Sequence, residues 1–279
     1  MPRALVVLGA GGIVGAGVAA AALEAGRAVV AVGMDADAAG VLAARHPGSR
    51  LVAIAAPVAS DADAAGLAAR LRALGAGIDG VVASLAGAHP CGRLLDEPAE
   101  VLQRTLDEDL LPHLFAARHL LPLLGDHSAG YVLVGGPGGR YPWAGYGHCS
   151  IAAAALRMMA RVLHDEAGRQ GQRVQLLSMD APLGHDAADA ALALGRRALA
   201  MLDGARARFP EPIHDYPGAM TSGVIARAPP RGASSPATGR RRRPASGDVL
   251  PARDLRAARA LLDAIASPTS PGNLHDEHC

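Results

Sequence analysis

The run Leu5-Val6-Val7-Leu8, followed by the turn Gly9-Ala10-Gly11-Gly12-Ile13-Val14-Gly15, decides the fold of this chain. The first four residues are apolar and of strand length, and residues 14–25 form an alanine-rich helical segment that ends at Gly26. A strand, a glycine-rich turn and a helix in this order are typical of the first half of a dinucleotide-binding unit. The segment therefore predicts a nucleotide site near the amino terminus.

Each glycine of the turn has a separate expected role. Gly9 permits the tight turn, Gly12 lets a pyrophosphate approach the backbone, and Gly15 lets the helix pack closely on the strand. The phosphate would lie on the N–H groups at the positive end of the helix. The candidate cofactor-binding residues of the turn are Gly9, Gly11, Gly12, Ile13 and Gly15. The alternative interpretation is that the glycines form a turn and bind nothing.

Apolar runs of strand length alternate with helical segments over the first 183 residues. Continuous apolar runs are typical of parallel strands covered by helices on both faces. The alternation predicts an α/β fold, a Rossmann-like doubly wound parallel sheet of about seven strands flanked by helices, with an irregular C-terminal extension. The expected strands are 5–8, 28–32, 50–55, 80–84, 130–134, 173–177 and a last short one at 249–250. The expected helices are 14–25, 36–45, 62–74, 98–124, 151–168, 186–202 and 253–265.

The pattern weakens beyond about residue 183, which suggests three regions. We expect a Rossmann-type nucleotide-binding and catalytic domain over residues 1–203 and a flexible, lid-like segment rich in Pro, Gly and Arg over residues 204–250. A C-terminal helix and tail are expected over residues 251–279. The run Arg240-Arg241-Arg242-Arg243 lies in the middle segment. Four arginines can contact a phosphate or a nucleic acid, and the alternative that we favour is a solvated linker.

Composition narrows the class of protein. Half of the 279 residues are hydrophobic and the formal net charge is +1, so the chain has no strong attraction for nucleic acid. No apolar run reaches the roughly 18–20 residues that span a bilayer, and the amino terminus lacks a signal-peptide pattern. Cys91, Cys149 and Cys279 lack the spacing of metal ligands and fit a reducing compartment. We therefore expect a cytoplasmic protein with no metal, membrane or nucleic-acid partner.

Three later segments carry further signals. Ser84-Leu85-Ala86-Gly87 follows the fourth apolar run, Thr105-Leu106-Asp107-Glu108-Asp109-Leu110 lies in the long helical segment, and Tyr146-Gly147-His148-Cys149-Ser150 precedes the next helix. Together with the glycine turn, they resemble the short-chain dehydrogenase/reductase family over about residues 3–183. That family usually has Asn-Asn-Ala-Gly in the first segment, a catalytic Asn at the end of the second, and Tyr-x-x-x-Lys in the third. The resemblance implies a nicotinamide cofactor and oxidoreductase chemistry.

The chain departs from the family at the catalytic positions. The family's working tetrad is Asn, Ser, Tyr and Lys, and only the Tyr is matched, by Tyr146. Asp109 takes the position of the Asn and Ser150 that of the Lys, while one of residues 135–137 (Gly-Gly-Pro) replaces the Ser. No realignment supplies the Lys, because all 27 basic residues are arginine. The resemblance therefore implies an atypical member.

The missing lysine has a directional consequence. In the family's mechanism the Tyr exchanges a proton with the substrate oxygen while hydride passes to or from the nicotinamide, and the Lys cation lowers the pKa of the Tyr. Without a lysine, the phenol of Tyr146 is expected to stay protonated near pH 7. A neutral phenol donates a proton but is a poor base, so carbonyl reduction is favoured over alcohol oxidation.

The candidate catalytic residues are Tyr146, Ser150 and Asp109, and each has an alternative role. Tyr146 is a proton donor or a packing residue. Ser150 either bonds the nicotinamide ribose or caps a helix beginning at Ile151, and we favour the cap. Asp109 orients a water or is a partly exposed carboxylate. His148 titrates near neutrality and is a further candidate, with an exposed or capping role favoured.

The cofactor expected from the resemblance is NAD(P)H, with NAD(H) favoured. The second apolar run is followed by Gly33, which carries no selective side chain, and by Asp35. An acidic residue favours a free ribose 2′-hydroxyl, and no basic residue adjoins Asp35. The alternative role for Asp35 is that of a loop or helix-start residue. Ser84, Ala86 and Gly87 complete the candidate cofactor-binding set.

Three functions remain open from the sequence. The first is an atypical NAD(P)-dependent oxidoreductase that reduces a carbonyl of a small molecule. The second is a cofactor-binding sensor or scaffold that kept the fold and lost the chemistry. The third is a non-redox enzyme, such as a lyase or isomerase, with His148 or Asp109 as base. Fold alone does not choose among them, and a homo-oligomer is possible for each.

Overall fold

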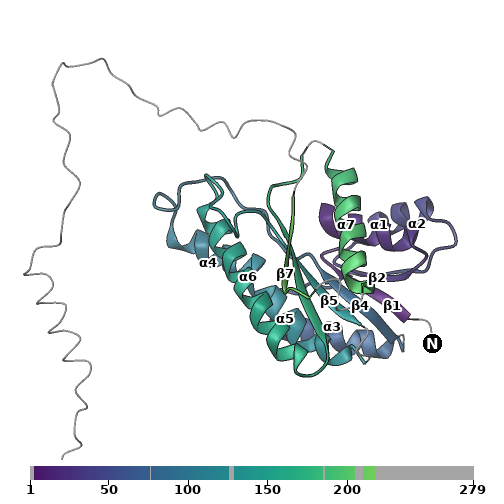
Figure 1. The fold of residues 1–279 in the computed structure, drawn as a ribbon. Coiled ribbons are helices and arrows are strands. Elements are labelled where there is room, and N and C mark those ends of the chain that lie inside the picture. Colours follow the sequence, from purple (N-terminus) through teal and green to yellow (C-terminus); the bar gives the residue numbers. More distant parts are fainter. Residues whose placement is uncertain (1–2, 76, 126–128, 185, 205–209, 218–279) are drawn as a thin grey trace, which may run out of the picture. The chain divides into compact units, whose positions relative to one another are not determined.

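The computed structural model describes residues 3–75, 77–125, 129–184, 186–204 and 210–217. Its centre is a seven-stranded sheet in the order β3-β2-β1-β4-β5-β6-β7, with every neighbouring pair parallel (Figure 1). The strands are β1 (Arg3–Leu8), β2 (Ala28–Val32), β3 (Leu51–Ile54), β4 (Gly77–Ala83), β5 (Gly130–Gly135), β6 (Arg173–Met179) and β7 (Ile213–Tyr216). The predicted Rossmann-like class is confirmed, since this order is the doubly wound one extended by one strand.

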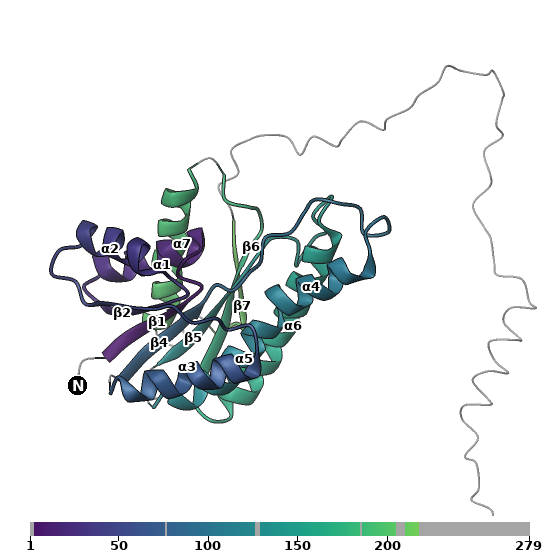
Figure 2. The same cartoon turned by 180° about the vertical axis from the view of Figure 1, so that it is seen from behind.

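Helices cover both faces of the sheet. One face carries α1 (Ile13–Glu24), α2 (Ala36–Arg45) and α7 (Ala187–Asp203) (Figure 1). The opposite face carries α3 (Asp61–Ala73), α4 (Ala99–Asp109), α5 (Leu111–Leu120), the 3-10 turn η1 (Leu121–Leu123) and α6 (Gly147–Gly168), as the reverse view shows (Figure 2). Because both faces are covered, β1, β2, β5 and β6 are buried along nearly their whole length.

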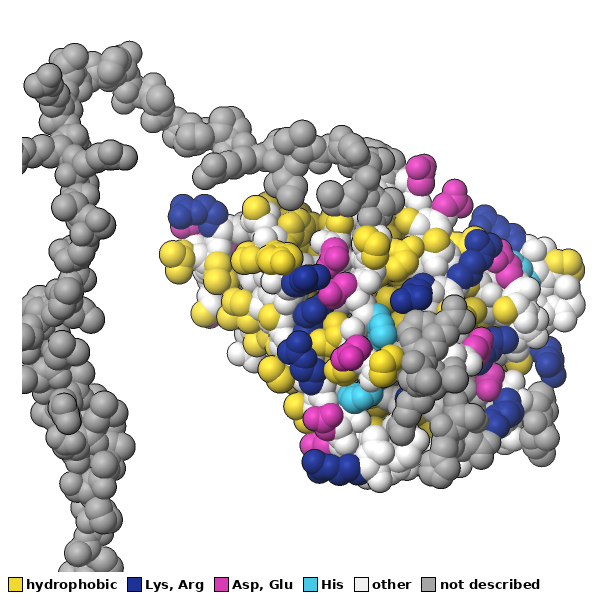
Figure 3. Space-filling view, in the orientation of Figure 1, with side chains coloured by type: hydrophobic (Ala, Val, Ile, Leu, Met, Phe, Trp, Pro, Cys, Tyr) yellow, Lys and Arg dark blue, Asp and Glu magenta, His cyan; other side chains and the backbone are white. Residues whose placement is uncertain are grey.

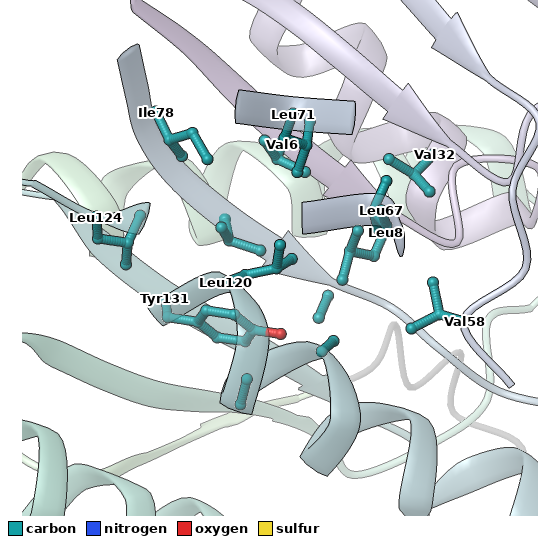
Figure 4. Close-up of a cluster of buried hydrophobic side chains, with 14 of the residues drawn as sticks. Val6, Leu8, Val32, Val58, Leu67, Leu71, Ile78, Leu120, Leu124 and Tyr131 are labelled. Carbon is teal, nitrogen blue, oxygen red and sulfur yellow. The ribbon is translucent and has the colours of Figure 1, made fainter. Parts of the chain in front are cut away.

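Alternate residues of each strand enter the two halves of the core. Val6 and Leu8 point to the half closed by α3, α5 and α6, whereas Leu5 and Val7 point to the half closed by α1, α2 and α7. Tyr131 of β5 lies in the first half, among leucines of α5 and its neighbours (Figure 4). Its hydroxyl is fully buried without a hydrogen-bond partner among the described residues, and burial raises its pKa.

Three expected elements differ from those observed. The single helix expected over residues 98–124 is broken between α4 and α5, because Pro112 has no N–H to donate and its ring excludes the regular helix before it; η1 follows α5 where Pro122 lies. Helix α6 begins at Gly147, four residues before the expected start at Ile151. The seventh strand is β7, inside the segment expected to be irregular, while the strand expected at residues 249–250 lies outside the described residues.

The described residues all belong to one compact unit, which spans Met1–Ile225. The expected arginine-rich segment and the expected C-terminal helix at residues 253–265 lie outside the part of the chain that the structure describes. Among the described helices, none combines the length and the apolar character needed to cross a membrane.

Candidate active site

Two adjoining cavities lie where β1, β4, β5 and β6 end. The turn cavity, of about 340 Å³, is lined by the glycine turn, by Gly33 and by the segment after β4. The Tyr146 cavity, of about 360 Å³, is lined by Tyr146, Asp109 and the segments after β4 and β5. The two cavities share Leu85, Ala86 and Gly87. Open α/β sheets bind ligands at the carboxyl ends of their strands, so the pair of cavities forms one candidate groove.

The glycine turn is closed by backbone contacts that exclude side chains. Gly9 has a φ of +71°, and a Cβ there would collide with the backbone of Ser84. A Cβ on Gly15 would collide with the backbone of Gly9, and a Cβ on Gly11 with that of Gly33. These three glycines are therefore required by the fold itself, whether or not a ligand binds.

Gly12 differs from the other glycines of the turn. A Cβ on Gly12 would meet only the carbonyl oxygen of Gly9, at 3.5 Å, which is an ordinary contact. Gly12 lines the turn cavity and is the N-cap of α1, where no side chain caps the helix. Ile13 follows it at the helix start and is 61% exposed. An uncapped helix start that opens onto a cavity is a favourable place for a phosphate.

The other predicted cofactor-binding residues divide between the groove and the surface. Ser84, Ala86 and Gly87 line the turn cavity, as does Gly33. Asp35 does not line it: this exposed carboxylate is the N-cap of α2 and accepts a hydrogen bond from the N–H of Ala38 at 2.7 Å. The predicted alternative role of Asp35 as a helix-start residue is thus observed.

Tyr146 stands at the entrance to α6, as its N-cap. Its ring stacks on the ring of Trp143, with centroids 4.0 Å apart and planes 20° from parallel, and both rings line the Tyr146 cavity. An isolated parallel bridge to Gly92 ties this point of the chain to the segment after β4. The stack holds the phenol ring against the wall of the cavity.

Ser150 is engaged with the backbone of the loop before α6. Its Oγ accepts a hydrogen bond from the N–H of Trp143 at 2.9 Å and donates one to the carbonyl oxygen of Tyr146 at 3.0 Å. The side chain does not line the Tyr146 cavity. The expectation that Ser150 is the N-cap is wrong: its backbone N–H donates to the carbonyl oxygen of Tyr146 at 2.9 Å, so α6 already begins at Gly147 with Tyr146 as the cap.

Asp109 holds together the segment after β4. Its Oδ1 accepts a hydrogen bond from the N–H of Gly87 at 2.7 Å and lies 2.8 Å from Nε2 of His89. The Asp109 side chain is 18% exposed and that of His89 only 6% exposed, and both line the Tyr146 cavity. His89 is not among the residues predicted from the sequence. Its only signal was the pair His89-Pro90 just after Gly87, which has no characteristic spacing from Asp109.

Cys149 is the third chemically active side chain at this point of the cavity. Ligand atoms of Cys149, His89 and Asp109 all lie within 4.8 Å of one another. Burial, together with the negative charge of Asp109, raises the pKa of the Cys149 thiol to about 11. His148 is 1% exposed and does not line the cavity, and its ring meets that of His89 edge-on with centroids 5.9 Å apart. The predicted exposed position of His148 is therefore wrong.

His113 supports the strip of chain that the two cavities share. It is completely buried on α5, and its Nε2 lies 3.0 Å from the carbonyl oxygen of Leu85. Burial lowers the pKa of His113 to about 4, although the hydrogen bond with Leu85 opposes this shift. The ring is therefore neutral near pH 7, with Nε2 donating its proton to Leu85.

The sequence matches a known family over most of its folded part. The family model described as Enoyl-(Acyl carrier protein) reductase matches residues 9–197. The chain belongs to the short-chain dehydrogenase/reductase family. Members of this family are NAD(P)-dependent oxidoreductases, and residues 9–197 include all the residues that line both cavities. No protein of curated function matches the sequence.

Solved structures of short-chain dehydrogenases share the fold at low identity. An NADPH-bound short-chain oxidoreductase from Pseudomonas aeruginosa PAO1, described as containing an atypical catalytic center, is 20% identical with a TM-score of 0.68, over 80% of this chain and 100% of that one. A short-chain dehydrogenase from Burkholderia cenocepacia in complex with NADP is 22% identical with a TM-score of 0.64, over 77% and 96%. L-sorbose reductase from Gluconobacter frateurii, complexed with NADPH and L-sorbose, is 18% identical with a TM-score of 0.66, over 80% and 98%.

Proposed function

We propose that this short-chain dehydrogenase/reductase is an atypical member that reduces a carbonyl group of a small molecule, with Tyr146 as the proton donor. The observation that carries the proposal is the strip Leu85-Ala86-Gly87, which lines both cavities. It brings the glycine turn and Tyr146 into one continuous groove. A nicotinamide dinucleotide bound along this groove would supply the hydride.

The residues of the turn cavity fit such a cofactor. Gly12 leaves room beside the uncapped start of α1, where the helix dipole and the backbone N–H groups favour a pyrophosphate. Ser84, Ala86 and Gly87 would carry the following part of the cofactor toward Tyr146. Asp107 and Glu108 also line this cavity, and their charges oppose an anionic ligand. The affinity for the cofactor is therefore expected to come from the glycine turn and from apolar contacts.

Tyr146 is proposed to protonate the substrate oxygen. A neutral phenol can do this without the lysine that the family ordinarily uses, and the chain contains no lysine. Val134, Leu156 and Met179 line the same cavity and favour a substrate with an apolar portion. We propose a positioning role for Asp109, since its Oδ1 already holds Gly87 and contacts His89. No chemical step is assigned to Ser150, whose Oγ bonds the backbone.

We propose NAD(H) as the preferred cofactor. Gly33 lines the turn cavity and Asp35 stands two residues further on, at the start of α2. Among the described residues that line the turn cavity, none is basic, so no cation is present there to pair with a 2′-phosphate. The test is a comparison of the dissociation constants of NADH and NADPH, in which tighter binding of NADPH would reject the preference.

A second candidate is a cofactor-binding sensor or scaffold without catalysis. It is favoured by the cavity wall after β5, where Gly136 and Pro137 offer no hydroxyl at the place of the family's serine. The third candidate, a non-redox enzyme, would use Asp109 with His89 as its base. His148, which is buried away from the cavity, does not support that role.

Turnover separates these candidates. Purified protein is incubated with NADH or NADPH and a panel of aldehydes and ketones, and nicotinamide absorbance is followed. Tyr146→Phe should lower the rate by about 10²–10⁴-fold while leaving NADH binding unchanged. Tyr141→Phe is the matched control, because Tyr141 is 70% exposed and does not line the cavity. Full activity in Tyr146→Phe would reject its role, and cofactor binding without turnover would favour the sensor.

We also propose that the protein forms a homo-oligomer through the surface where α4 and α6 lie. Hydrophobic side chains gather over the part of the surface where α4 and α6 lie (Figure 3). Ile151, Met158 and Val162 repeat on one face of α6 and are 39%, 56% and 46% exposed, which is unusual for a solvated helix face.

The unpaired Cys91 and Cys149 fit the cytoplasmic location proposed for this enzyme.

A further inference from the structure

Three side chains with metal-binding atoms converge on the wall of the Tyr146 cavity. His89 comes from the segment after β4, Asp109 from the end of α4, and Cys149 from the first turn of α6. Their ligand atoms lie within 4.8 Å of one another, and each residue is partly buried and lines the cavity. A nitrogen, an oxygen and a sulfur ligand are thus brought together from three separate elements.

The contacts of His89 fix the orientation of its ring, with Nε2 turned toward Asp109. On one edge of the ring, Nδ1 lies 3.5 Å from Oγ1 of Thr105 and 3.8 Å from Oε2 of Glu108. The Thr105 hydroxyl already donates its proton to the carbonyl oxygen of Val101 at 2.8 Å, so it can only accept from His89. Both separations are long for hydrogen bonds, so these neighbours do not hold the proton of a neutral ring on Nδ1.

On the other edge of the ring, Nε2 lies 2.8 Å from Oδ1 of Asp109, and a neutral ring donates its proton across this short contact. A divalent cation that binds both atoms would take the place of that proton, which would move to Nδ1. The ring cannot easily turn away, because His148 packs edge-on against it and its side chain is only 6% exposed.

We propose that His89, Asp109 and Cys149 form a transition-metal site, best suited to Zn²⁺, whose remaining coordination position faces the Tyr146 cavity. Imidazole and thiolate ligands select zinc over magnesium or calcium, which prefer oxygen ligands. Three protein ligands with one open position are typical of catalytic rather than structural zinc sites. Binding of Zn²⁺ would release the thiol proton of Cys149 to solvent, since the thiolate is the ligand.

The surroundings resemble the outer shell of a metal site. Nδ1 of His89 faces the Glu108 carboxylate, an arrangement that orients a ligating imidazole and raises its basicity. The N–H of Gly87 holds Oδ1 of Asp109. The two ligand charges, from the Asp109 carboxylate and the Cys149 thiolate, would balance the charge of Zn²⁺ at this partly buried position.

The proposed ion would supply a positive charge in a site that lacks the lysine cation of the family. A Lewis acid that binds the substrate oxygen polarises the carbonyl group without a proton. The role of the ion rests on the proposed carbonyl reduction, whereas the proposed binding of the ion does not depend on it. Tyr146 lines the same cavity and would still supply the proton.

The test is Co²⁺ binding to the full-length chain after treatment with a chelator and dialysis. We expect one Co²⁺ per chain, a thiolate-to-cobalt charge-transfer band in the near ultraviolet, and displacement of the band by Zn²⁺. Cys149→Ser should abolish the band, whereas Cys91→Ser should retain it, because Cys91 is exposed and lies outside the ligand set. Glu108→Gln should weaken metal affinity about 10-fold or more while leaving the ligands in place.

The outcomes separate the metal site from the proposed function. Absence of the charge-transfer band in the wild type, or its persistence in Cys149→Ser, would overturn the metal site and leave His89 hydrogen-bonded to Asp109. Far-ultraviolet circular dichroism and thermal unfolding of each variant confirm that the fold is retained. NADH titration of the same metal-free and metal-loaded samples is the second readout. Loss of NADH binding with an intact cobalt spectrum would reject the oxidoreductase proposal alone.

Discussion

Acid should destabilise this protein measurably through His113. The ring is completely buried, and burial lowers its pKa from the ordinary 6.5 to about 4. Above pH 6.5 the ring is neutral in both the folded and the unfolded chain and contributes no pH dependence. Between pH 6.5 and about 4 only the unfolded chain takes up the proton, so the free energy of unfolding falls as the pH falls.

The size of the effect follows from the two pKa values. A difference of one pKa unit is worth about 1.4 kcal/mol. His113 should therefore remove about 2 kcal/mol of stability at pH 5 and about 3 kcal/mol at pH 4, relative to pH 7. These losses are a large fraction of the roughly 5–15 kcal/mol that stabilises a typical domain.

Urea unfolding at steps of pH between 7 and 4.5 measures this loss. His113→Gln keeps a side-chain N–H for the carbonyl oxygen of Leu85 but does not titrate, so the difference between the wild type and the variant isolates His113. The control is His46→Gln at the C-terminal end of α2, which should follow the wild-type profile. Parallel pH profiles for the wild type and His113→Gln would refute the reasoning.

Three further predictions concern the core, the groove and the surface. Tyr131→Phe removes a buried hydroxyl that has no partner among the described residues, so its free energy of unfolding in urea should rise by about 1 kcal/mol; a loss would show that the hydroxyl is bonded. Asp107→Asn should lower the dissociation constant of NADH about two- to fivefold at low salt and little at high salt; an unchanged constant at low salt would contradict the predicted repulsion. Met158→Glu should shift the mass measured by light scattering toward the monomer, whereas Val41→Glu on α2 should not; equal masses would reject the proposed interface.

Most of the sheet could be predicted because its signals are local. Each buried strand is a continuous apolar run, and Gly9, with its positive φ, marks the turn after β1. Where a prediction failed, a specific contact decided the outcome. Pro112 separates α4 from α5, and the backbone hydrogen bond from the N–H of Ser150 to the carbonyl oxygen of Tyr146 starts α6 at Gly147. Such contacts leave no periodic pattern in the sequence from which they could be predicted.

The candidate site could be predicted only in part for the same reason. Tyr146 and Asp109 were found because each lies in a segment that resembles a family motif. His89 comes 20 residues before Asp109 in the chain, and the two side chains meet only in the folded protein. No characteristic spacing in the sequence predicts this contact. Cys149 likewise approaches both residues only after α6 is docked against α4. A convergence of side chains from three elements is a tertiary property.

Titration of the protein with NADH and NADPH, followed by nicotinamide fluorescence, tests the central claim most directly. Gly12→Ala is the decisive variant, because its methyl group fits the turn without a clash and occupies the wall of the cavity beside the start of α1. Gly66→Ala on α3 is the control, since it adds a methyl group in open space. The account predicts saturable binding by the wild type and Gly66→Ala, and affinity lowered about 10-fold or more, or about 1.4 kcal/mol, in Gly12→Ala. Failure of the wild type to bind either cofactor, or unchanged binding in Gly12→Ala, would contradict it.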